Sequence, residues 1–323
     1  MAHELYTNES GKVSMAYKGQ TPWHGLGQSM VENQSIEEWT QAAGMDFDIL
    51  SSPVQYQADQ QMFTFPKQKV LHRSDTFAPL AVVSSAFKVV QPKEVMEFYR
   101  DLTEQSGFTM ETAGVLFGGK KFWALAKIGQ QSKFLDDELK GYLMLATAND
   151  GTFATTAAFT SIRVVCNNTL GFAMTEIDNG ESKNNVKVSH RSMFDANAVK
   201  SQLGIASASW DNFMKNVDVW CSTSVSESQS KDFFKKLTAT KGSDGKLVTS
   251  ENTVEKLLDL YNGGGKGSTM STTKDTAWGL INAVTEYVDH HKGRAADTRM
   301  NSAFFGTGAT LKNKAVELVA ELV

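Results

Sequence analysis

Alternating apolar and polar residues in the first half of the chain predict a series of β-strands. The strand-like segments are residues 54–56, 62–65, 80–83, 87–90, 114–117, 121–126, 142–148 and 153–159. Gly118 and Gly119 lie between two of them and predict a hairpin with a tight turn. Asn149-Asp150-Gly151 lies between the last two segments and predicts the turn that joins them. These signals favour a mixed or antiparallel sheet.

Helical signals in this half are few. Ser35 and Glu38 have the spacing of a capping box, in which each side chain bonds a free backbone amide at the start of a helix. Pro92 suits the first turn of another helix, because apolar residues recur at helical spacing from there to Leu102. We therefore expect a helix that crosses the sheet.

Beyond Ser189 the pattern becomes helical. Apolar residues recur at helical spacing in residues 192–239, 251–262, 274–292 and 308–322, and polar, glycine-rich stretches separate them. The predicted fold class is α+β. Residues 1–190 form a β-rich domain with a β-hairpin and a crossing helix, and residues 191–323 form a helical region. The two regions can also belong to one continuous domain.

Composition narrows the class of protein. The 323 residues are 41% hydrophobic, enough for a sizeable core. No apolar run approaches the roughly 20 residues that cross a bilayer, and the N-terminus lacks the basic start of a secretion signal. Cys166 and Cys221 are too few for a disulfide framework or a four-thiolate zinc site. We expect a cytoplasmic protein with no membrane partner.

Charge excludes one mode of nucleic-acid binding. With 32 basic and 36 acidic residues the net charge is −4, so the protein does not coat DNA by its bulk charge. A local basic groove is still allowed, because phosphate binding depends on where the cations lie.

The glycine-rich segment 263–269 is a candidate phosphate loop. A Walker loop has glycine directly before lysine and then serine or threonine, whereas here Lys266 is followed by Gly267. A flexible linker is the simpler interpretation, and a cationic loop that orders on a polyanion is the alternative. We predict no nucleotide cofactor.

Two clusters are candidates for catalysis. Glu286, Asp289 and His290 are potential metal ligands, but the spacing of a zinc-binding helix is absent, and basic groups at a helix C-terminus also compensate its dipole. Cys166 has no histidine nearby in the sequence to activate it, so a buried thiol is favoured. We predict no metal and no catalytic residue, and the sequence favours a protein that is not an enzyme.

Candidate nucleic-acid contacts are cations and amides that lie near aromatic residues or cluster along the chain. Basic grooves with aromatic faces suit single strands, whose exposed bases stack on rings. The predicted set is Lys88, Lys120, Lys121, Trp123, Arg163, Asn167, Asn168, Lys187, His190, Arg191, Arg294, Lys312 and Lys314. Each member also has a simpler interpretation as a solvated charge, a helix cap or, for the tryptophan, a core residue.

Lys312 and Lys314 carry the strongest of these signals. They follow Gly306-Thr307-Gly308 in the first turns of a predicted helix, where a positive charge opposes the helix dipole. A bound anion would remove that conflict, so this position predicts a phosphate contact.

Several motifs, taken in chain order, resemble the phage/plasmid-like protein family named domain of unknown function 932. The stretches that carry the resemblance are residues 22–27, 87–92, 118–124, 149–151, 163–170, 276–279, 282–283 and 287–290, of which Arg163-Val164-Val165-Cys166-Asn167-Asn168 is the most distinctive. Many relatives have a histidine where this chain has Asn149, which weakens a catalytic role for that turn. The resemblance implies residence on a bacteriophage, plasmid or integrated element.

The family is in turn distantly similar to single-strand annealing proteins of the RecT, Red-beta and Rad type, in which a β-sheet crossed by a helix holds DNA in an oligomeric ring. The resulting hypothesis is an ATP-independent protein that binds and anneals single-stranded DNA in recombination or replication. It implies a homo-oligomer in the bacterial host cytoplasm. The alternatives are a protein-interaction factor, such as an antagonist of host defence, and a metal-dependent nuclease that uses Glu286, Asp289 and His290.

Overall fold

The computed structural model describes most of the chain. The described residues are 5, 7–8, 11–19, 26–134, 137–163, 168–171, 177–178, 181–182, 185–203, 206–241, 247–293, 302–303 and 306–323, some of them by their backbone alone. The chain divides into two compact units. Unit 1 comprises residues 1–129, 142–158 and 185–204, and unit 2 comprises residues 130–141, 159–184 and 205–323.

The first half of the chain is mostly β-structure, as expected. Its elements are β1 (Met15–Lys18), β2 (Gln28–Met30), α1 (Ile36–Ala42), β3 (Ile49–Ala58), β4 (Gln61–Arg73), β5 (Pro79–Ser84), α2 (Pro92–Glu97), α3 (Arg100–Gln105), β6 (Thr109–Leu116), η1 (Phe117–Gly119), β7 (Lys121–Phe134), β8 (Asp137–Ala148) and β9 (Thr155–Arg163).

The second half is mostly helical. Its elements are β10 (Asn168–Gly171), β11 (Ile177–Asp178), β12 (Glu181–Ser182), β13 (Asn185–Val188), α4 (Ala196–Leu203), α5 (Ala206–Ser222), α6 (Glu227–Thr238), β14 (Thr240–Lys241), β15 (Leu247–Val248), α7 (Glu251–Asp259), η2 (Leu260–Gly264), α8 (Ala277–Glu286), η3 (Tyr287–His291) and α10 (Thr307–Ala320). The predicted α+β class is confirmed. The predicted boundary at residue 190 falls inside the last segment of unit 1.

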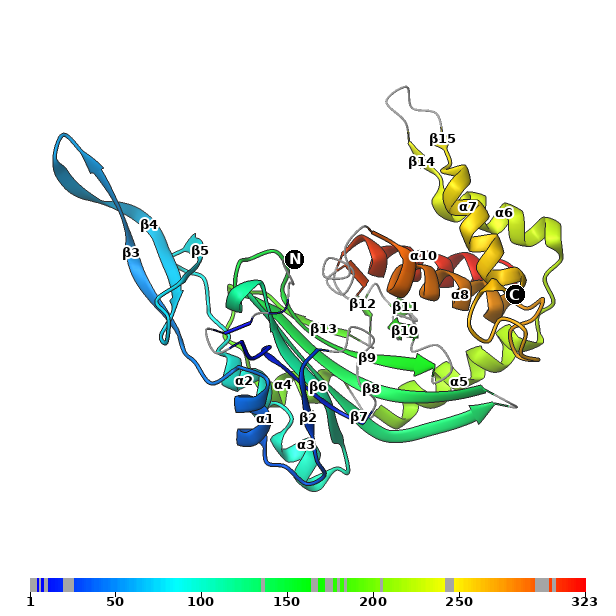
Figure 1. Ribbon diagram of the computed structural model, residues 1–323, viewed down its shortest axis with the longest axis horizontal. Helices are drawn as coiled ribbons and strands as arrows, with labels where there is room; N and C mark the ends of the chain where they lie inside the picture. The colour runs from blue at the N-terminus through cyan, green and yellow to red at the C-terminus, as the bar shows by residue number, and fades with distance from the viewer. Residues whose placement is uncertain are drawn as a thin grey trace. The chain divides into compact units, whose positions relative to one another are not determined.

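The largest sheet has the strand order β10-β9-β8-β7-β6-β1-β2, and β13 also pairs with β9 (Figure 1). It is mixed, because β1 pairs with β2 in parallel and with β6 in antiparallel. The predicted glycine hairpin is confirmed as β6–β7, with Leu116 opposite Lys121. Next to this turn, Gly114 lies opposite Trp123, and a Cβ on Gly114 would lie 2.2 Å from the indole ring. A glycine there lets the tryptophan lie flat across the neighbouring strand.

Helices α2 and α3 anchor the sheet of unit 1 through an aromatic pair between them. Phe98 and Tyr99 are fully buried. The Tyr99 hydroxyl lies 2.8 Å from the carbonyl oxygen of Ala124 on β7 and 3.1 Å from that of Leu143 on β8, and it donates its hydrogen between them. Burial raises the pKa of Tyr99 well above its ordinary value. The predicted helix from Pro92 to Leu102 therefore exists as two short helices with this pair at the break.

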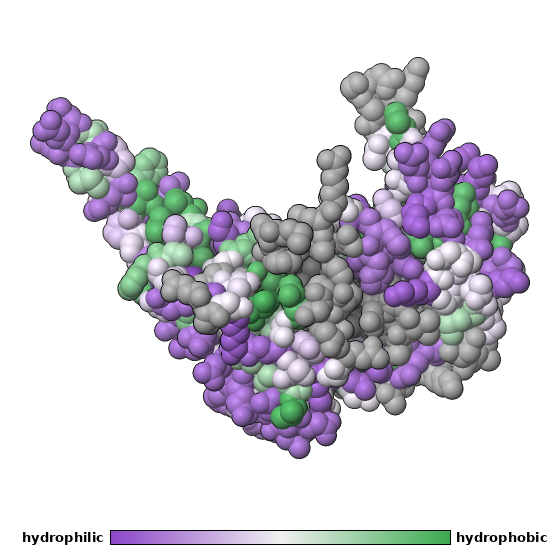
Figure 2. All heavy atoms as spheres, viewed as in Figure 1, coloured by the Kyte–Doolittle hydropathy of each residue, from purple (hydrophilic) through white to green (hydrophobic). Residues whose placement is uncertain are grey.

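A separate sheet has the strand order β3-β4-β5. Strands β3 and β4 are longer than β5, and they extend past its end as a two-stranded arm (Figure 1). Hydrophobic residues gather over this sheet on the side shown in Figure 2. Arg73, at the base of β4, is 3% exposed; its guanidinium bonds the carboxylate of Asp75, donates to the carbonyl oxygen of Gly118, and lies over the ring of Phe47. The base of the arm is therefore tied to the β6–β7 turn.

One strand prediction is wrong. Residues 87–90 form no strand, although their alternation resembles one. Their polar backbone groups instead bond to Asn149 and to His190. Side-chain and loop partners therefore satisfy this segment where a neighbouring strand was expected.

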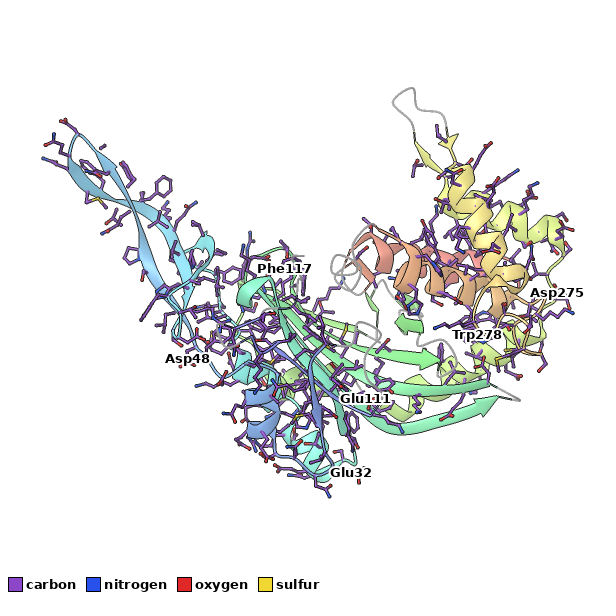
Figure 3. All side chains as sticks on the ribbon, viewed as in Figure 1. Glu32, Asp48, Glu111, Phe117, Asp275 and Trp278 are labelled. Atoms are coloured by element: carbon purple, nitrogen blue, oxygen red, sulfur yellow. The ribbon has the colours of Figure 1, made fainter. Side chains whose placement is uncertain are left out.

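Unit 2 is built around helix α8, which is buried along its length. Trp278 stacks on Trp220 of α5, with ring centroids 5.9 Å apart, and its indole nitrogen donates to the fully buried carboxylate of Asp137 (Figure 3). Thr272 donates to the same carboxylate oxygen. These contacts make Trp278 a core residue. Among the described residues, no helix is long and apolar enough to cross a membrane.

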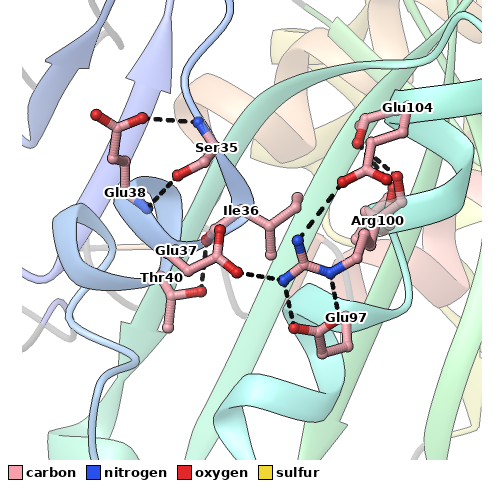
Figure 4. Close-up of polar contacts among 10 residues, drawn as sticks. Ser35, Ile36, Glu37, Glu38, Thr40, Glu97, Arg100 and Glu104 are labelled. Atoms are coloured by element: carbon pink, nitrogen blue, oxygen red, sulfur yellow. Dashed lines mark hydrogen bonds and ion pairs between the residues drawn. The ribbon is translucent and has the colours of Figure 1, made fainter.

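Arg100 gathers carboxylates from three helical segments (Figure 4). It pairs with Glu37 of α1, with Glu97 of α2 and with Glu104 of α3, at 2.5, 2.6 and 3.5 Å. The hydrogen bond from Arg100 lowers the pKa of Glu37 and of Glu97, and the two carboxylates raise the pKa of Arg100. Helix α1 begins beside this cluster with the predicted capping box, in which Ser35 and Glu38 bond each other's backbone amide.

We expect Arg100→Ala to lower the midpoint of thermal unfolding by a few degrees at neutral pH, because three carboxylates then face one another without a cation. The folded pKa of Glu97 lies below the ordinary 4.5, so its stabilisation is present above that value and is lost as the pH falls through the lowered pKa. The difference from wild type should therefore shrink below pH 4.5. Calorimetry at several pH values checks this. Lys93→Ala, at an exposed pair with Asp48, is the control and should change little.

Candidate nucleic-acid interface

The buried side chain of Asn149 joins three chain segments at one end of unit 1. Its Oδ1 accepts from the amide of Val90 and its Nδ2 donates to the carbonyl oxygen of the same residue, at 3.2 and 2.9 Å. Its own backbone amide donates to the carbonyl oxygen of Lys120 at 2.8 Å. One residue of the β8–β9 turn thus fixes both the irregular segment 87–90 and the β6–β7 turn.

His190 adds a fourth segment in the same way. The amide of Lys88 donates to the His190 carbonyl oxygen, and the His190 Nδ1 donates to the Lys88 carbonyl oxygen at 3.0 Å. Its ring stacks on Phe87 with centroids 4.3 Å apart and an interplanar angle of 13°. His190 is 9% exposed. We therefore assign it to positioning Lys88 and Arg191, and not to contact with a ligand.

Phenylalanine rings flank Lys121 at the β6–β7 turn. Its ammonium lies 5.0 Å from the centroid of Phe117, which is labelled at this turn in Figure 3, and 5.5 Å from that of Phe153 in the β8–β9 turn. Both rings are half-buried, while Lys121 is 8% exposed. The two turns thus share one cation and present two partly open aromatic rings.

Cations without an acidic partner surround this group of segments, which we call the basic end of unit 1. Lys88, Lys187 and Arg191 are exposed and Lys120 is half-buried. Within the described part of the chain, none of these four has a carboxylate at ion-pairing distance. Asp150 lies in the β8–β9 turn itself, and its Oδ1 accepts hydrogen bonds from Thr152. These four cations are therefore not paired with carboxylates within the described residues, in a protein whose net charge is −4.

Sequence reasoning missed part of this site. Lys69 on β4 donates to the carbonyl oxygen of Phe87 at 2.9 Å, which brings a further cation to the basic end. Phe117 and Phe153 were not proposed, although each lies within four residues of a glycine turn. Aromatic residues beside turns that also hold lysine were the available signal.

Trp123 lies on β7 in the core of unit 1 and is 4% exposed. A base cannot stack on a buried ring, so we do not retain this residue in the site. Arg163 and Asn168 face each other in the β9–β10 ladder, and only their backbone is described. Asn167 and Arg294 lie outside the described residues. All four belong to chain segments of unit 2.

Lys312 and Lys314 have partners inside unit 2. Lys312 is 3% exposed, and its ammonium lies 2.6 Å from the carboxylate of Asp289. Lys314 donates to the carbonyl oxygens of Lys236 and Leu237, at the end of α6. These contacts resolve the conflict with the helix dipole without an external anion. The phosphate contact predicted at this helix is therefore not retained.

The acidic residues of the nuclease alternative are engaged in the same way. Both carboxylate oxygens of Glu286 accept from the backbone amide of Lys266, in the glycine-rich loop, at 2.9 and 3.1 Å. The protein's own carboxylate thus occupies the amide that a phosphate would need. Among the described residues, no group of three His, Cys, Asp or Glu side chains is placed to hold a metal ion.

Comparison with known proteins identifies the family. Residues 79–308, which are more than half of the chain, match the model of the family described as domain of unknown function, DUF932. The chain belongs to the DUF932 family. No curated protein and no solved structure matches it. In this DUF932 protein the matched region includes the segments of the basic end from residue 87 to residue 191, whereas β3 and β4 precede it.

We expect Asn149→Ala to lower the free energy of unfolding by about 2–4 kcal/mol, because it leaves the buried amide and carbonyl of Val90 without partners. Denaturant unfolding measures the change. Asp150→Ala, in the same turn but only half-buried, should cost less than about 1 kcal/mol. Equal losses in the two variants would contradict the assigned role of Asn149.

Replacing Lys312 by methionine should cost about 3–5 kcal/mol, because it leaves the carboxylate of Asp289 buried without its cation. The double variant Asp289→Asn, Lys312→Met should recover most of that loss. Chemical denaturation of the two variants checks this. If the single variant is as stable as wild type, the ion pair does not hold α10 in place.

Proposed function

We propose that this protein is an ATP-independent, single-stranded DNA-binding accessory of a phage or plasmid, which acts in recombination or replication in the host cytoplasm. The observation that carries the proposal is the basic end of unit 1. Four chain segments bring Lys88, Lys120, Lys187 and Arg191 together there, without acidic partners among the described residues. The site needs no bulk positive charge, in keeping with the net charge of −4.

Aromatic rings favour single strands over duplex DNA. Phe117 and Phe153 are half-buried beside Lys121, so part of each ring faces outward. Bases of a single strand are free to stack on such faces, whereas the bases of a duplex are stacked on each other. Phosphates bind the exposed cations and the rings receive unstacked bases. The likeness to RecT, Red-beta and Rad-type annealing proteins is part of the same proposal and predicts that the protein pairs complementary strands.

The test compares two triple variants that remove the same charge. Lys88→Ala, Lys187→Ala, Arg191→Ala should weaken binding of a labelled single strand at least tenfold at low salt. It should also reduce the slope of log affinity against log salt by about 2, since each lost phosphate contact on a single strand contributes about 0.7. Fluorescence anisotropy at several salt concentrations measures both.

The control is Lys215→Ala, Lys231→Ala, Lys235→Ala, which removes three exposed lysines from helices α5 and α6 of unit 2. Its affinity and salt slope should stay close to wild type. An equal loss in both triple variants would show binding by net charge alone. Absence of binding by wild type at low salt would end the proposal.

A further inference from the structure

The sheet β3-β4-β5 has an apolar face that the described remainder of unit 1 leaves open. Alternation along β3 places Leu50, Val54 and Tyr56 on one side. Their neighbours across the ladders are Phe63, opposite Tyr56, and Val82, which joins this side through Val70 and Ser52. We call Leu50, Tyr56, Phe63 and Val82 the arm face; their exposed fractions are 44%, 49%, 41% and 54%.

The other side of the same sheet is buried at its base. Ile49, Leu71 and Val83 are 4%, 0% and 8% exposed and pack into unit 1. A sheet that buries one side usually presents polar residues on the other, and apolar residues on both sides are typical of sheets covered on both sides. The arm face therefore has the composition of a covered surface.

The two aromatic rings of the arm face stack on each other. Tyr56 and Phe63 form a cross-strand pair with ring centroids 5.6 Å apart and an interplanar angle of 24°. Such a pair is a firm apolar platform near the β3–β4 turn, of the kind that carries most of the binding energy in protein contacts. The hydrophobic residues of this sheet are visible as a group in Figure 2.

The low number of charged side chains in the arm indicates what kind of partner it contacts. Residues 50–66 contain a single charged side chain, Asp59, at the tip between β3 and β4. Lys67 and Lys69 follow on β4, but Leu50, Tyr56, Phe63 and Val82 themselves carry no charge, so a polyanion or a charged peptide finds no counter-charge among them. Two copies of an uncharged apolar face meet without repulsion, and in a two-fold contact each residue finds a complementary apolar surface on the other copy.

The exposed area fits such a contact. At these exposures the arm face, with the half-buried Val54 and Val70, offers about 400 Å² of apolar surface, since a large side chain carries on the order of 150–250 Å². An interface is about 57% apolar, so this corresponds to about 700 Å² on each partner and about 1,400 Å² in total. Specific protein contacts bury about 1,200–2,000 Å².

We propose that the arm face is the contact surface between two copies of this chain, related by a two-fold axis. The two edge strands of the sheet support this arrangement. β3 and β5 each pair only with β4 among the described strands, so each leaves an edge beside the arm face for backbone contacts to the second copy. This contact is independent of the proposed DNA binding.

The test replaces the two stacked rings by a residue that suits a strand but has little apolar surface. Wild type should show a mass that rises with concentration from 35.4 kDa towards twice that value in light scattering after size exclusion. Tyr56→Thr, Phe63→Thr should remain at 35.4 kDa over the same range. Because both rings are half-exposed, circular dichroism and the unfolding midpoint should match wild type and show that the variant is folded.

Gln55→Thr, Gln57→Thr is the matched control, since both glutamines are exposed on the opposite side of β3. It should associate like wild type. A wild-type mass of 35.4 kDa at every concentration overturns the proposal, and so does unchanged association of the ring variant. If the ring variant loses affinity for single-stranded DNA while its mass stays that of wild type, the face stacks on bases and the proposal also fails.

Discussion

The buried amide of Asn149 is the interaction on which the basic end of unit 1 depends. Segment 87–90 does not pair with a strand, so its backbone amides and carbonyl groups need hydrogen-bond partners from elsewhere in the chain. The Asn149 side chain supplies both to Val90, and its own amide holds the carbonyl of Lys120. A carboxylate or an aliphatic side chain could not donate and accept at once. The places of Lys88 and Lys120 in the fold therefore depend on the hydrogen bonds of Asn149 and of His190.

Some of the described cations have carboxylate partners inside their own unit, and others do not. Arg73, Arg100 and Lys312 each bind carboxylates and stabilise contacts between segments of their own unit. Lys88, Lys187 and Arg191 are exposed and lack such partners among the described residues. The number of charges is thus a poor guide to binding. An acidic protein can present a basic surface when its carboxylates pair with cations elsewhere, as Asp75 does with Arg73 and Asp289 does with Lys312.

Unit 1 presents two surfaces of opposite chemistry. The basic end combines cations with half-buried phenylalanines, which suits a polyanion with flat bases. The residues of the arm face are aromatic or aliphatic and carry no charge, which suits another protein surface. Lys69 and Arg73 connect them, because the first bonds the segment at Phe87 and the second bonds the turn at Gly118. Strand β4 is therefore part of the arm sheet and also contacts two segments of the basic end.

The sequence by itself determined the elements that local chemistry specifies. The capping box at Ser35, the glycine hairpin between β6 and β7, and the helical second half follow from spacing and turn residues, and the α+β class follows from them. The tertiary structure alone decided which cations have partners. Lys312 and Asp289 are 23 residues apart, and Asn149 and Val90 are 59 apart, so no local pattern reports these contacts. Burial of Trp123 and exposure of Tyr56 were equally hidden, because alternation along a strand shows that two faces exist and not which of them the rest of the chain covers.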